Sequence, residues 1–247
     1  MITLEGIVLR EKPYGEQDKF IDVITKDRGL LEVAVKGARK ITGRSSSSTQ
    51  LFAYSRFCIN NSKDRLTLNS AEPIHIFYDL RKSLTGLSLA AYFADVLRFS
   101  TAERTDSGNV MRLFLNTLHF LEKGLRNEKM LKSIFELRLM SEIGFMPDVV
   151  CCRGCGAFEP KELYFSVMGG GFVCPDCAGG EQLENDFKME LPVLSAVRHI
   201  VLADFSRLFN FRLSEHALDR LSVFAEIYIL SHFERSFSTL DFYKNLL

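Results

Sequence analysis

The chain has 247 residues, of which 47% are hydrophobic and 25% are charged, and 31 basic side chains balance 31 acidic ones. These values predict a soluble chain long enough to bury a core over two domains, and they exclude a disordered segment, a collagen-like repeat and a disulfide-rich miniprotein. The balance hides an asymmetry, because residues 1–78 carry twelve Lys or Arg against nine Asp or Glu, whereas residues 181–247 carry seven against ten.

Residues 1–78 alternate apolar and polar side chains and are rich in β-branched residues, which predicts strands. The expected strands are residues 3–9, 19–25, 31–35, 51–59 and 66–76. Short breaks rich in Gly, Asn and Asp suit antiparallel hairpins rather than βαβ crossovers. If the five strands form a small Greek-key barrel of the OB type, its faces and loops are common oligonucleotide sites. Residues 37–50 are basic, then serine-rich, without apolar periodicity, and are expected to form a mobile loop.

From Tyr78 onward, apolar residues recur three and four positions apart, which predicts helices. The first three expected helices are residues 80–100, one from Val110 that ends before Gly124, and one from Leu131 that ends before Gly144. A fourth begins near Pro192, and a fifth, capped by Ser214, continues to about residue 233. The fold class is therefore α+β and multidomain: an OB-type barrel over residues 1–78, then a helical domain over residues 79–247 that contains a cysteine-rich insertion, residues 149–180.

Localisation is expected to be cytoplasmic. The stretch 83–94 lacks charge but is only twelve residues long, whereas a membrane helix needs roughly 20. The N-terminal segment carries charges where a secretory signal has an apolar core. Cysteines in this compartment are reduced by default.

The insertion contains two C-x₂-C pairs separated by eighteen residues, Cys152 with Cys155 and Cys174 with Cys177. This spacing is typical of two tight turns that converge on one tetrahedral ion, so we expect these four thiolates to bind Zn²⁺. A closed four-sulfur site leaves no position for water, which favours a structural metal. The alternative is a set of reduced, unmetallated cysteines.

Two further cysteines stay outside the expected ligand set. Cys151 precedes the first pair and is a possible substitute ligand through a C-x₃-C pair, which is a less usual geometry. Cys58 lies in an expected strand and is interpreted as a small buried hydrophobe.

No acidic residue lies between Glu32 and Asp64, and this interval is a candidate anion-binding surface. A solvated face is the commoner meaning of a charge run. The basic residues of this interval leave an expected strand and enter an expected flexible loop, and this position favours phosphate binding over a merely solvated face. The basic residues of the interval are Lys36, Arg39, Lys40, Arg44, Arg56 and Lys63.

Three aromatic residues of the expected barrel, Phe20, Tyr54 and Phe57, are candidates for base stacking. For each of them, filling of the barrel interior is the preferred interpretation, because a small barrel is filled by its own side chains. We expect weak sequence preference, since no base-reading helix is evident.

A catalytic site is not expected. The five histidines match no metal-hydrolase motif, and the phosphate-loop, nucleophile-elbow and dinucleotide motifs are all absent from the sequence. Glu16, Asp18 and Asp22 alternate with other residues in an expected strand and are interpreted as a solvated face.

The sequence resembles the RecO family of bacterial recombination mediators over most of its length. The cysteine insertion within a helical region matches zinc-bearing members, and the N-terminal pattern matches at residues 6–9, Tyr14-Gly15-Glu16-x-Asp18, Thr25 with Gly29, and Val35-Lys36-Gly37-Ala38-Arg39. The resemblance implies an OB domain, no enzymatic turnover, and binding and annealing of DNA.

The resemblance also implies partners. They are single- and double-stranded DNA, RecR and the C-terminal tail of the single-strand binding protein SSB, so that RecA loads onto SSB-coated DNA in the RecFOR pathway of DNA repair. The helical domain is expected to hold the SSB-tail pocket, and the protein to be nucleoid-associated. Lys36 and Arg39 come from the matching pattern as phosphate contacts, whereas Lys40 and Arg44 are added from the charge argument.

Two other functions stay open. One is a zinc-ribbon scaffold that binds other proteins and touches DNA only incidentally. The other, ranked last because no carboxylate constellation supports it, is a nuclease or metal-dependent hydrolase with an unfamiliar site.

Overall fold

The computed structural model describes residues 1–38, 47–62, 65–103, 105–178 and 186–247. Contacts divide the chain into two compact units, the first comprising Met1–Lys123 with Phe237–Leu247 and the second Gly124–Ser236. The domain boundaries expected from the sequence, at residue 78 and around 149–180, stay a prediction. Within the described parts of the chain, none of the helices combines the length and the apolar character that a bilayer crossing requires.

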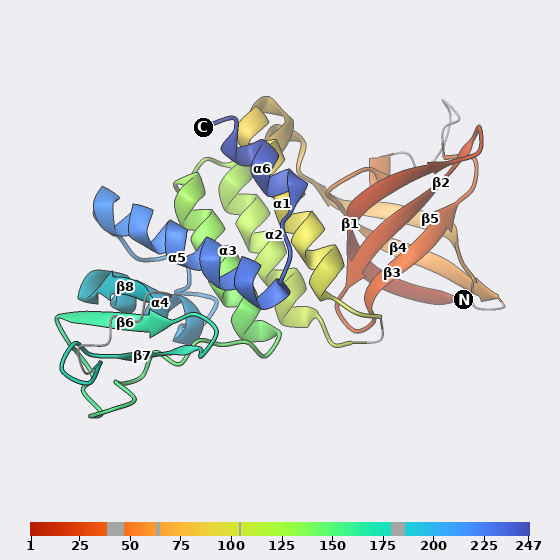
Figure 1. Ribbon diagram of the computed structural model, residues 1–247. Helices are drawn as coiled ribbons and strands as arrows, with labels where there is room; N and C mark the ends of the chain where they lie inside the picture. The colour runs from red at the N-terminus through yellow and green to blue at the C-terminus, as the bar shows by residue number, and fades with distance from the viewer. Residues whose placement is uncertain (39–46, 63–64, 104, 179–185) are drawn as a thin grey trace. The chain divides into compact units, whose positions relative to one another are not determined.

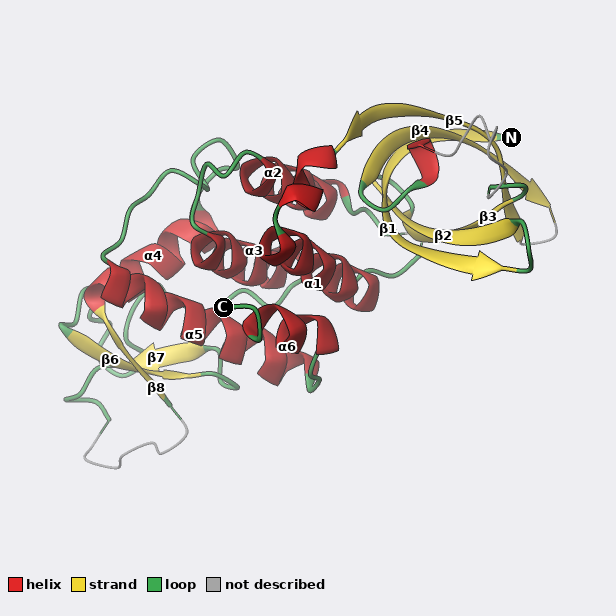
Figure 2. Ribbon diagram, turned by 90° about the horizontal axis from the view of Figure 1, so that it is seen from above, coloured by secondary structure: helices red, strands yellow, loops and turns green. Residues whose placement is uncertain are grey.

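The first unit begins with a closed five-stranded barrel, seen end-on in Figure 2. Strands run in the order β1-β2-β3-β5-β4, with β3 parallel to β5 through Ala34 and Thr67 and the other pairs antiparallel. This is the Greek-key order of the OB type, as predicted. The strands are β1 (Ile2–Tyr14), β2 (Asp18–Thr25), β3 (Gly29–Val35), β4 (Ala53–Ser62) and β5 (Arg65–Ile76).

The barrel interior is filled by the apolar residues that alternate along its strands. Because successive side chains of a strand point to opposite faces, charged residues between them lie outside. The buried core residues are Val8, Ile21, Val23, Leu31, Val33, Val35, Ala53, Phe57 and Ile59.

Among the described residues, three α-helices and two short 3₁₀ segments complete the first unit (Figure 1): η1 (Ser47–Thr49), η2 (Tyr78–Lys82), α1 (Leu84–Ser100), α2 (Gly108–Glu122) and α6 (Ser238–Lys244). The helix predicted from residue 80 breaks at Ser83, because its side chain accepts from the Gly86 N–H at 3.0 Å and caps α1. Helix α6 has no counterpart in the prediction; Phe237 at its start packs against Tyr92 of α1, with ring centroids 5.9 Å apart.

Asp22 corrects the interpretation of a solvated carboxylate face. It is only 6% exposed. Its carboxylate accepts a hydrogen bond from Arg98 of α1 at 2.7 Å and forms an ion pair with Arg10, whose Nε lies 2.9 Å away. The two guanidinium groups compensate the burial of its charge. The ion pair therefore ties strand β2 to helix α1.

The second unit contains three helices and a small antiparallel sheet. Ser214 caps α5 as predicted, accepting from the Ala217 N–H at 3.3 Å, and Pro192 lies in the first turn of α4. Strands β6 and β7 form a hairpin, and the sheet has a third strand, β8, which was not predicted. The elements are α3 (Glu128–Glu142), β6 (Glu162–Ser166), β7 (Gly171–Val173), β8 (Phe187–Glu190), α4 (Leu191–Leu202) and α5 (Glu215–Phe233).

A buried ion-pair cluster links α3 to α5. Lys132, 2% exposed, lies 2.9 Å from both Glu136 and Glu226. Burial lowers the pKa of Lys132, but the two carboxylates outweigh burial and hold the pKa above its ordinary value. Lys132 is therefore charged, and removing it would leave carboxylates buried without their cation.

We expect Lys132→Met to lower the free energy of unfolding by about 3–5 kcal/mol, because breaking a buried pair leaves uncompensated charge. Chemical denaturation of the whole chain measures this change in the free energy of unfolding. Lys129→Met is the matched control: Lys129 lies on the same helix and pairs with Asp219 at 2.6 Å, but both side chains are about half exposed, so its loss costs less than about 1 kcal/mol. Equal effects of the two changes would contradict this account.

Candidate metal site and nucleic-acid interface

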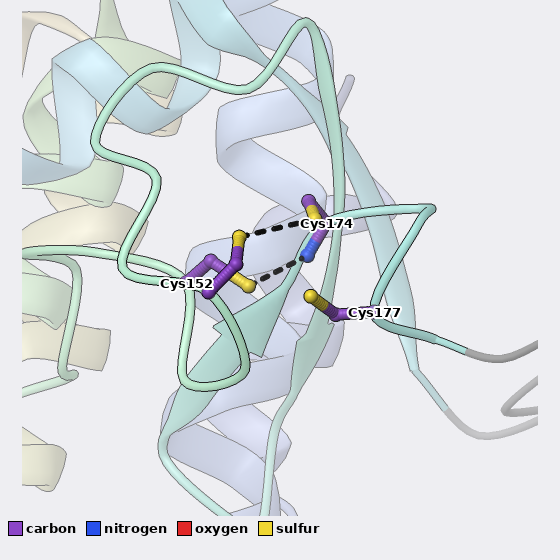
Figure 3. Close-up of side chains that lie close together, drawn as sticks. Cys152, Cys174 and Cys177 are labelled. Atoms are coloured by element: carbon purple, nitrogen blue, oxygen red, sulfur yellow. Dashed lines mark hydrogen bonds between the residues drawn. The ribbon is translucent and has the colours of Figure 1, made fainter.

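The four cysteines chosen by their spacing converge in the structure. The sulfur atoms of Cys152, Cys155, Cys174 and Cys177 all lie within 4.8 Å of one another, and this cluster could hold a metal ion. Cys152 and Cys155 belong to the loop that precedes β6, and Cys174 directly follows β7. Figure 3 shows Cys152, Cys174 and Cys177 turned toward one another.

Backbone N–H groups point at the sulfur of Cys152. Those of Gly154 and Cys174 donate to it at 3.4 and 3.2 Å, and the second of these bonds can be followed in Figure 3. A Cβ at residue 154 would come within 2.7 Å of the Cys177 sulfur, so glycine is required for this approach. Such donors stabilise thiolates, which are the metal-binding form of cysteine.

The thiols of the cluster differ in pKa. Burial raises the pKa of Cys152, but backbone N–H groups of Cys155, Cys174 and Gly154 outweigh burial and lower the pKa to about 6. Hydrogen bonds with Cys174 and Cys155 raise the pKa of Cys177 to about 12. Binding of a cation would release these retained protons, because metal affinity requires deprotonated thiols.

The other two cysteines lie outside the cluster. Cys151 is adjacent in sequence but is not among the four grouped sulfurs. Cys58 is only half-buried, which corrects the expectation of a fully buried residue. Its side chain alternates with the core residues Phe57 and Ile59 and therefore lies on the outer side of the barrel.

Of the four predicted DNA-binding residues, Lys36 is the one that lies in the described part of the chain. It is exposed and directly follows β3. The next residue, Gly37, has φ +62° and donates its N–H to Asp18 at 2.8 Å, which fixes the chain where it leaves the strand. Arg39, Lys40 and Arg44 lie outside the described residues, as does Lys63.

Two other basic residues of the barrel are engaged by carboxylates. Arg56 is exposed but pairs with Glu5 at 2.9 Å. Lys19 is 9% exposed, contacts Glu11 at 2.7 Å and donates to the Thr49 carbonyl at 2.8 Å. Lys36 is therefore a better candidate for phosphate than either of them.

The three candidate aromatic residues have different environments. Phe57 is fully buried in the barrel core, which agrees with its preferred interpretation. Tyr54 is half-buried and donates its hydroxyl to Glu5 at 2.8 Å; burial and this bond raise its pKa to about 12. Phe20 is half-buried and, alternating with the core residue Ile21, lies on the outer face.

The second unit contains a cavity that the sequence did not reveal, because its lining comes from two distant segments. Its volume is about 560 Å³. Arg126 supports the wall by donating to the Phe209 carbonyl at 2.9 Å and to Asn210 at 3.2 Å. The lining residues are Leu125, Arg126, Asn127, Met130, Asn210, Phe211, Arg212, Leu213 and Leu218.

Fold and site together define a class: an OB-type barrel protein whose helical part carries a small sheet and a four-cysteine cluster. The family description "Recombination protein O N terminal" matches residues 1–77, and "Recombination protein O C terminal" matches residues 81–241. The chain is 35% identical to the DNA repair protein RecO of Acetivibrio thermocellus over 99% of this chain and 97% of the relative. It is 28% identical to that of Alkaliphilus metalliredigens over the full length of both.

The chain therefore belongs to the RecO family of DNA repair and recombination proteins. This confirms the resemblance noted in the sequence. The family is one of non-enzymatic recombination mediators.

The geometry predicts that the purified chain binds one equivalent of a thiophilic divalent metal, with Co²⁺ as the probe. Four thiolates around one ion give Co²⁺ an intense thiolate charge-transfer absorption, and we expect Cys174→Ser to reduce both the absorption and the bound metal by more than half. Cys151→Ser is the matched control and retains both. Full metal binding by the Cys174 variant, or its loss in the Cys151 variant, would show that the ligand set is wrong.

Proposed function

We propose that the protein is a DNA-binding recombination mediator that anneals complementary strands and, with RecR, helps to load RecA onto SSB-coated single-stranded DNA. Membership of the RecO family carries this proposal. The exposed Lys36 at the end of β3 supports it, since the strands and loops of OB barrels are common oligonucleotide sites. A cytoplasmic, nucleoid-associated location follows from this role.

The proposed mechanism involves no bond chemistry. Lys36, Arg39, Lys40 and Arg44 neutralise phosphates of single- or double-stranded DNA, which lowers the repulsion between two strands that are about to pair. Base pairing between the strands then drives annealing. Contacts with SSB keep the mediator on coated DNA.

We further propose that the metal is Zn²⁺, held by Cys152, Cys155, Cys174 and Cys177 in a structural role. Tetrahedral zinc with bonds of about 2.3 Å to sulfur separates the sulfurs by about 3.8 Å. The Cys155 and Cys174 sulfurs are 3.7 Å apart, which fits this geometry. Zinc would fix the two loops beside β6 and β7 to each other.

The C-terminal tail of SSB is proposed to bind the cavity of the second unit. Its lining combines apolar side chains such as Leu125, Met130 and Leu218 with two arginines, Arg126 and Arg212. An apolar floor buries a hydrophobic side chain, and arginine recognises a carboxylate such as a chain terminus. Arg126 is already engaged by backbone, so the exposed Arg212 is the proposed carboxylate partner.

The alternative is a zinc-ribbon scaffold that contacts proteins and binds DNA only incidentally. The four-cysteine cluster and its small sheet are compatible with it. It predicts that changes on the barrel leave strand annealing unaffected, which separates it from the mediator.

Charge reversal at Lys36 tests the DNA site. A charge-assisted hydrogen bond contributes about 1.5–3 kcal/mol, so we expect Lys36→Glu to weaken binding of single-stranded and duplex DNA at low salt by roughly ten-fold or more and to slow annealing. Gel shift and a fluorescence annealing assay measure the effect. Lys161→Glu makes the same charge change at an exposed lysine of the second unit and is expected to bind normally. Unchanged affinity of the Lys36 variant would contradict the proposal.

The SSB-tail proposal has its own test, the affinity of a fluorescent peptide with the sequence of the SSB C-terminus. We expect Arg212→Glu to weaken binding by roughly ten-fold, because it places a second carboxylate beside the first. Amidating the peptide's C-terminus should weaken binding to the unchanged protein as well. Arg207→Glu, an exposed arginine outside the cavity lining, serves as the control. If the Arg212 variant bound the peptide normally, the tail would have another site.

A further inference from the structure

A row of residues crosses the outer face of the barrel at the end where β3 finishes. Lys12 of β1 lies opposite Phe20 of β2, Phe20 lies opposite Ala34 of β3, and Ala34 lies opposite Thr67 of β5. Directly opposed residues share a face of a sheet. Phe20 alternates with the core residue Ile21, so the row lies on the outer side of the sheet, where Ala34 is covered and only 6% exposed.

Phe20 is accompanied by a second ring and a cation. Tyr14 is 56% exposed and meets Phe20 edge-to-face, with centroids 5.1 Å apart. The guanidinium carbon of Arg65 lies 5.9 Å from the Phe20 centroid, over the ring. This distance is at the outer limit of a cation–π contact, so the arginine is held loosely there.

A cavity of about 320 Å³ opens beside this ring. Two arginines and two carboxylates line it, so its formal charge balances to zero, and the carboxylates disfavour a phosphate group. The mixture of one ring, an amide and groups of both signs suits a flat, neutral molecule with hydrogen-bond donors and acceptors. Its lining residues are Phe20, Arg28, Leu31, Glu32, Asn61, Arg65, Leu66 and Glu103.

We propose that this cavity holds one unpaired nucleobase of single-stranded DNA, stacked on Phe20. The inference rests on the proposed DNA-binding function and adds a base contact to its phosphate contacts. Stacking on aromatic rings and on arginine planes is a common way to hold unpaired bases without strong sequence preference.

The geometry allows the base to enter between the ring and the guanidinium. Two planes that flank a stacked base are about 7 Å apart, twice the roughly 3.4 Å repeat of a DNA strand. Arg65 is 5.9 Å from the ring, so it needs to retreat by about 1 Å, which an exposed arginine does easily.

Phosphates on either side of the base have cations within reach. Lys12 is exposed directly opposite Phe20, and Lys36 lies two residues beyond Ala34, the other neighbour of Phe20. At a strand rise of about 3.3 Å per residue, this offset is roughly 7 Å. The base cavity and the phosphate site are therefore about one nucleotide apart.

The carboxylates of the cavity add a preference among bases. Carboxylates accept hydrogen bonds from the exocyclic amino group of cytosine, which thymine lacks. Glu32 and Glu103 both line the cavity. The site is therefore expected to favour cytosine over thymine. The base site is not expected to contribute to the affinity for duplex DNA, since the bases of a duplex are already stacked and paired.

The experiment compares the binding of oligo(dC), oligo(dT) and a duplex at low salt. Loss of one base stack weakens binding about five-fold or more, so we expect Phe20→Leu to reduce affinity for both single strands by this factor and to leave duplex affinity unchanged. Tyr14→Ser, at an exposed position, is expected to weaken single-strand binding in the same direction. Glu32→Gln should reduce the preference for oligo(dC).

A matched control is available in the same unit. Tyr78 is 53% exposed and has the Arg81 guanidinium 5.5 Å from its ring, but it does not line the cavity. Tyr78→Leu therefore removes the same kind of pair and should leave all three affinities unchanged. The stacking of 2-aminopurine placed within the oligonucleotide gives a direct signal: its fluorescence should fall on binding to the unchanged protein and fall less with Phe20→Leu.

The outcomes separate this inference from the proposed function. If Phe20→Leu and Tyr14→Ser bind single strands normally while Lys36→Glu binds them weakly, the base site is wrong and the phosphate site stands. If Phe20→Leu weakens binding of single-stranded and duplex DNA equally, the proposed stacking of an unpaired base on Phe20 is wrong. If none of the three changes has an effect, the barrel surface does not bind DNA and the proposed function fails with it.

Discussion

The small closed barrel imposes the constraint on which the rest of the first unit depends. A barrel of five strands has room only for side chains, and apolar residues such as Val23, Val33 and Phe57 fill it. Such an interior leaves little room for charged side chains or further rings, which are favoured on the outside or at a strand end. Lys12, Phe20 and Lys36 occupy such positions, and closure through β3 and β5 brings Arg65 close to them. The interaction surface is thus a consequence of how the interior is packed.

Each unit is held by a buried electrostatic arrangement in addition to its apolar core. In the first unit, Asp22 joins the barrel to α1 through Arg10 and Arg98. In the second, Lys132 joins α3 to α5, and the four sulfurs bring the two cysteine loops together beside the small sheet. These arrangements specify which elements pack together. Lys36, the proposed DNA contact that lies in the described part of the chain, is instead exposed to solvent.

Features set by local sequence were predictable, and those set by distant contacts were not. The strand alternation, the Ser214 cap and the two C-x₂-C pairs depend on neighbouring residues, and all three are found. Asp22 was misinterpreted because its partner Arg98 is 76 residues away. Helix α6 has only seven residues and depends on tertiary packing around Phe237. The cavity containing Arg126 and Arg212 joins two distant segments, so no local pattern marks it.

The central claim is that the barrel surface holds DNA backbones electrostatically, and the salt dependence of single-strand affinity tests it most directly. Each phosphate contact with a single strand contributes about −0.7 to the slope of log Kobs against log salt, so four to six contacts predict a slope of about −3 to −4. Binding would then be strong only at low salt. A slope near zero, with affinity maintained as salt rises, would contradict the account.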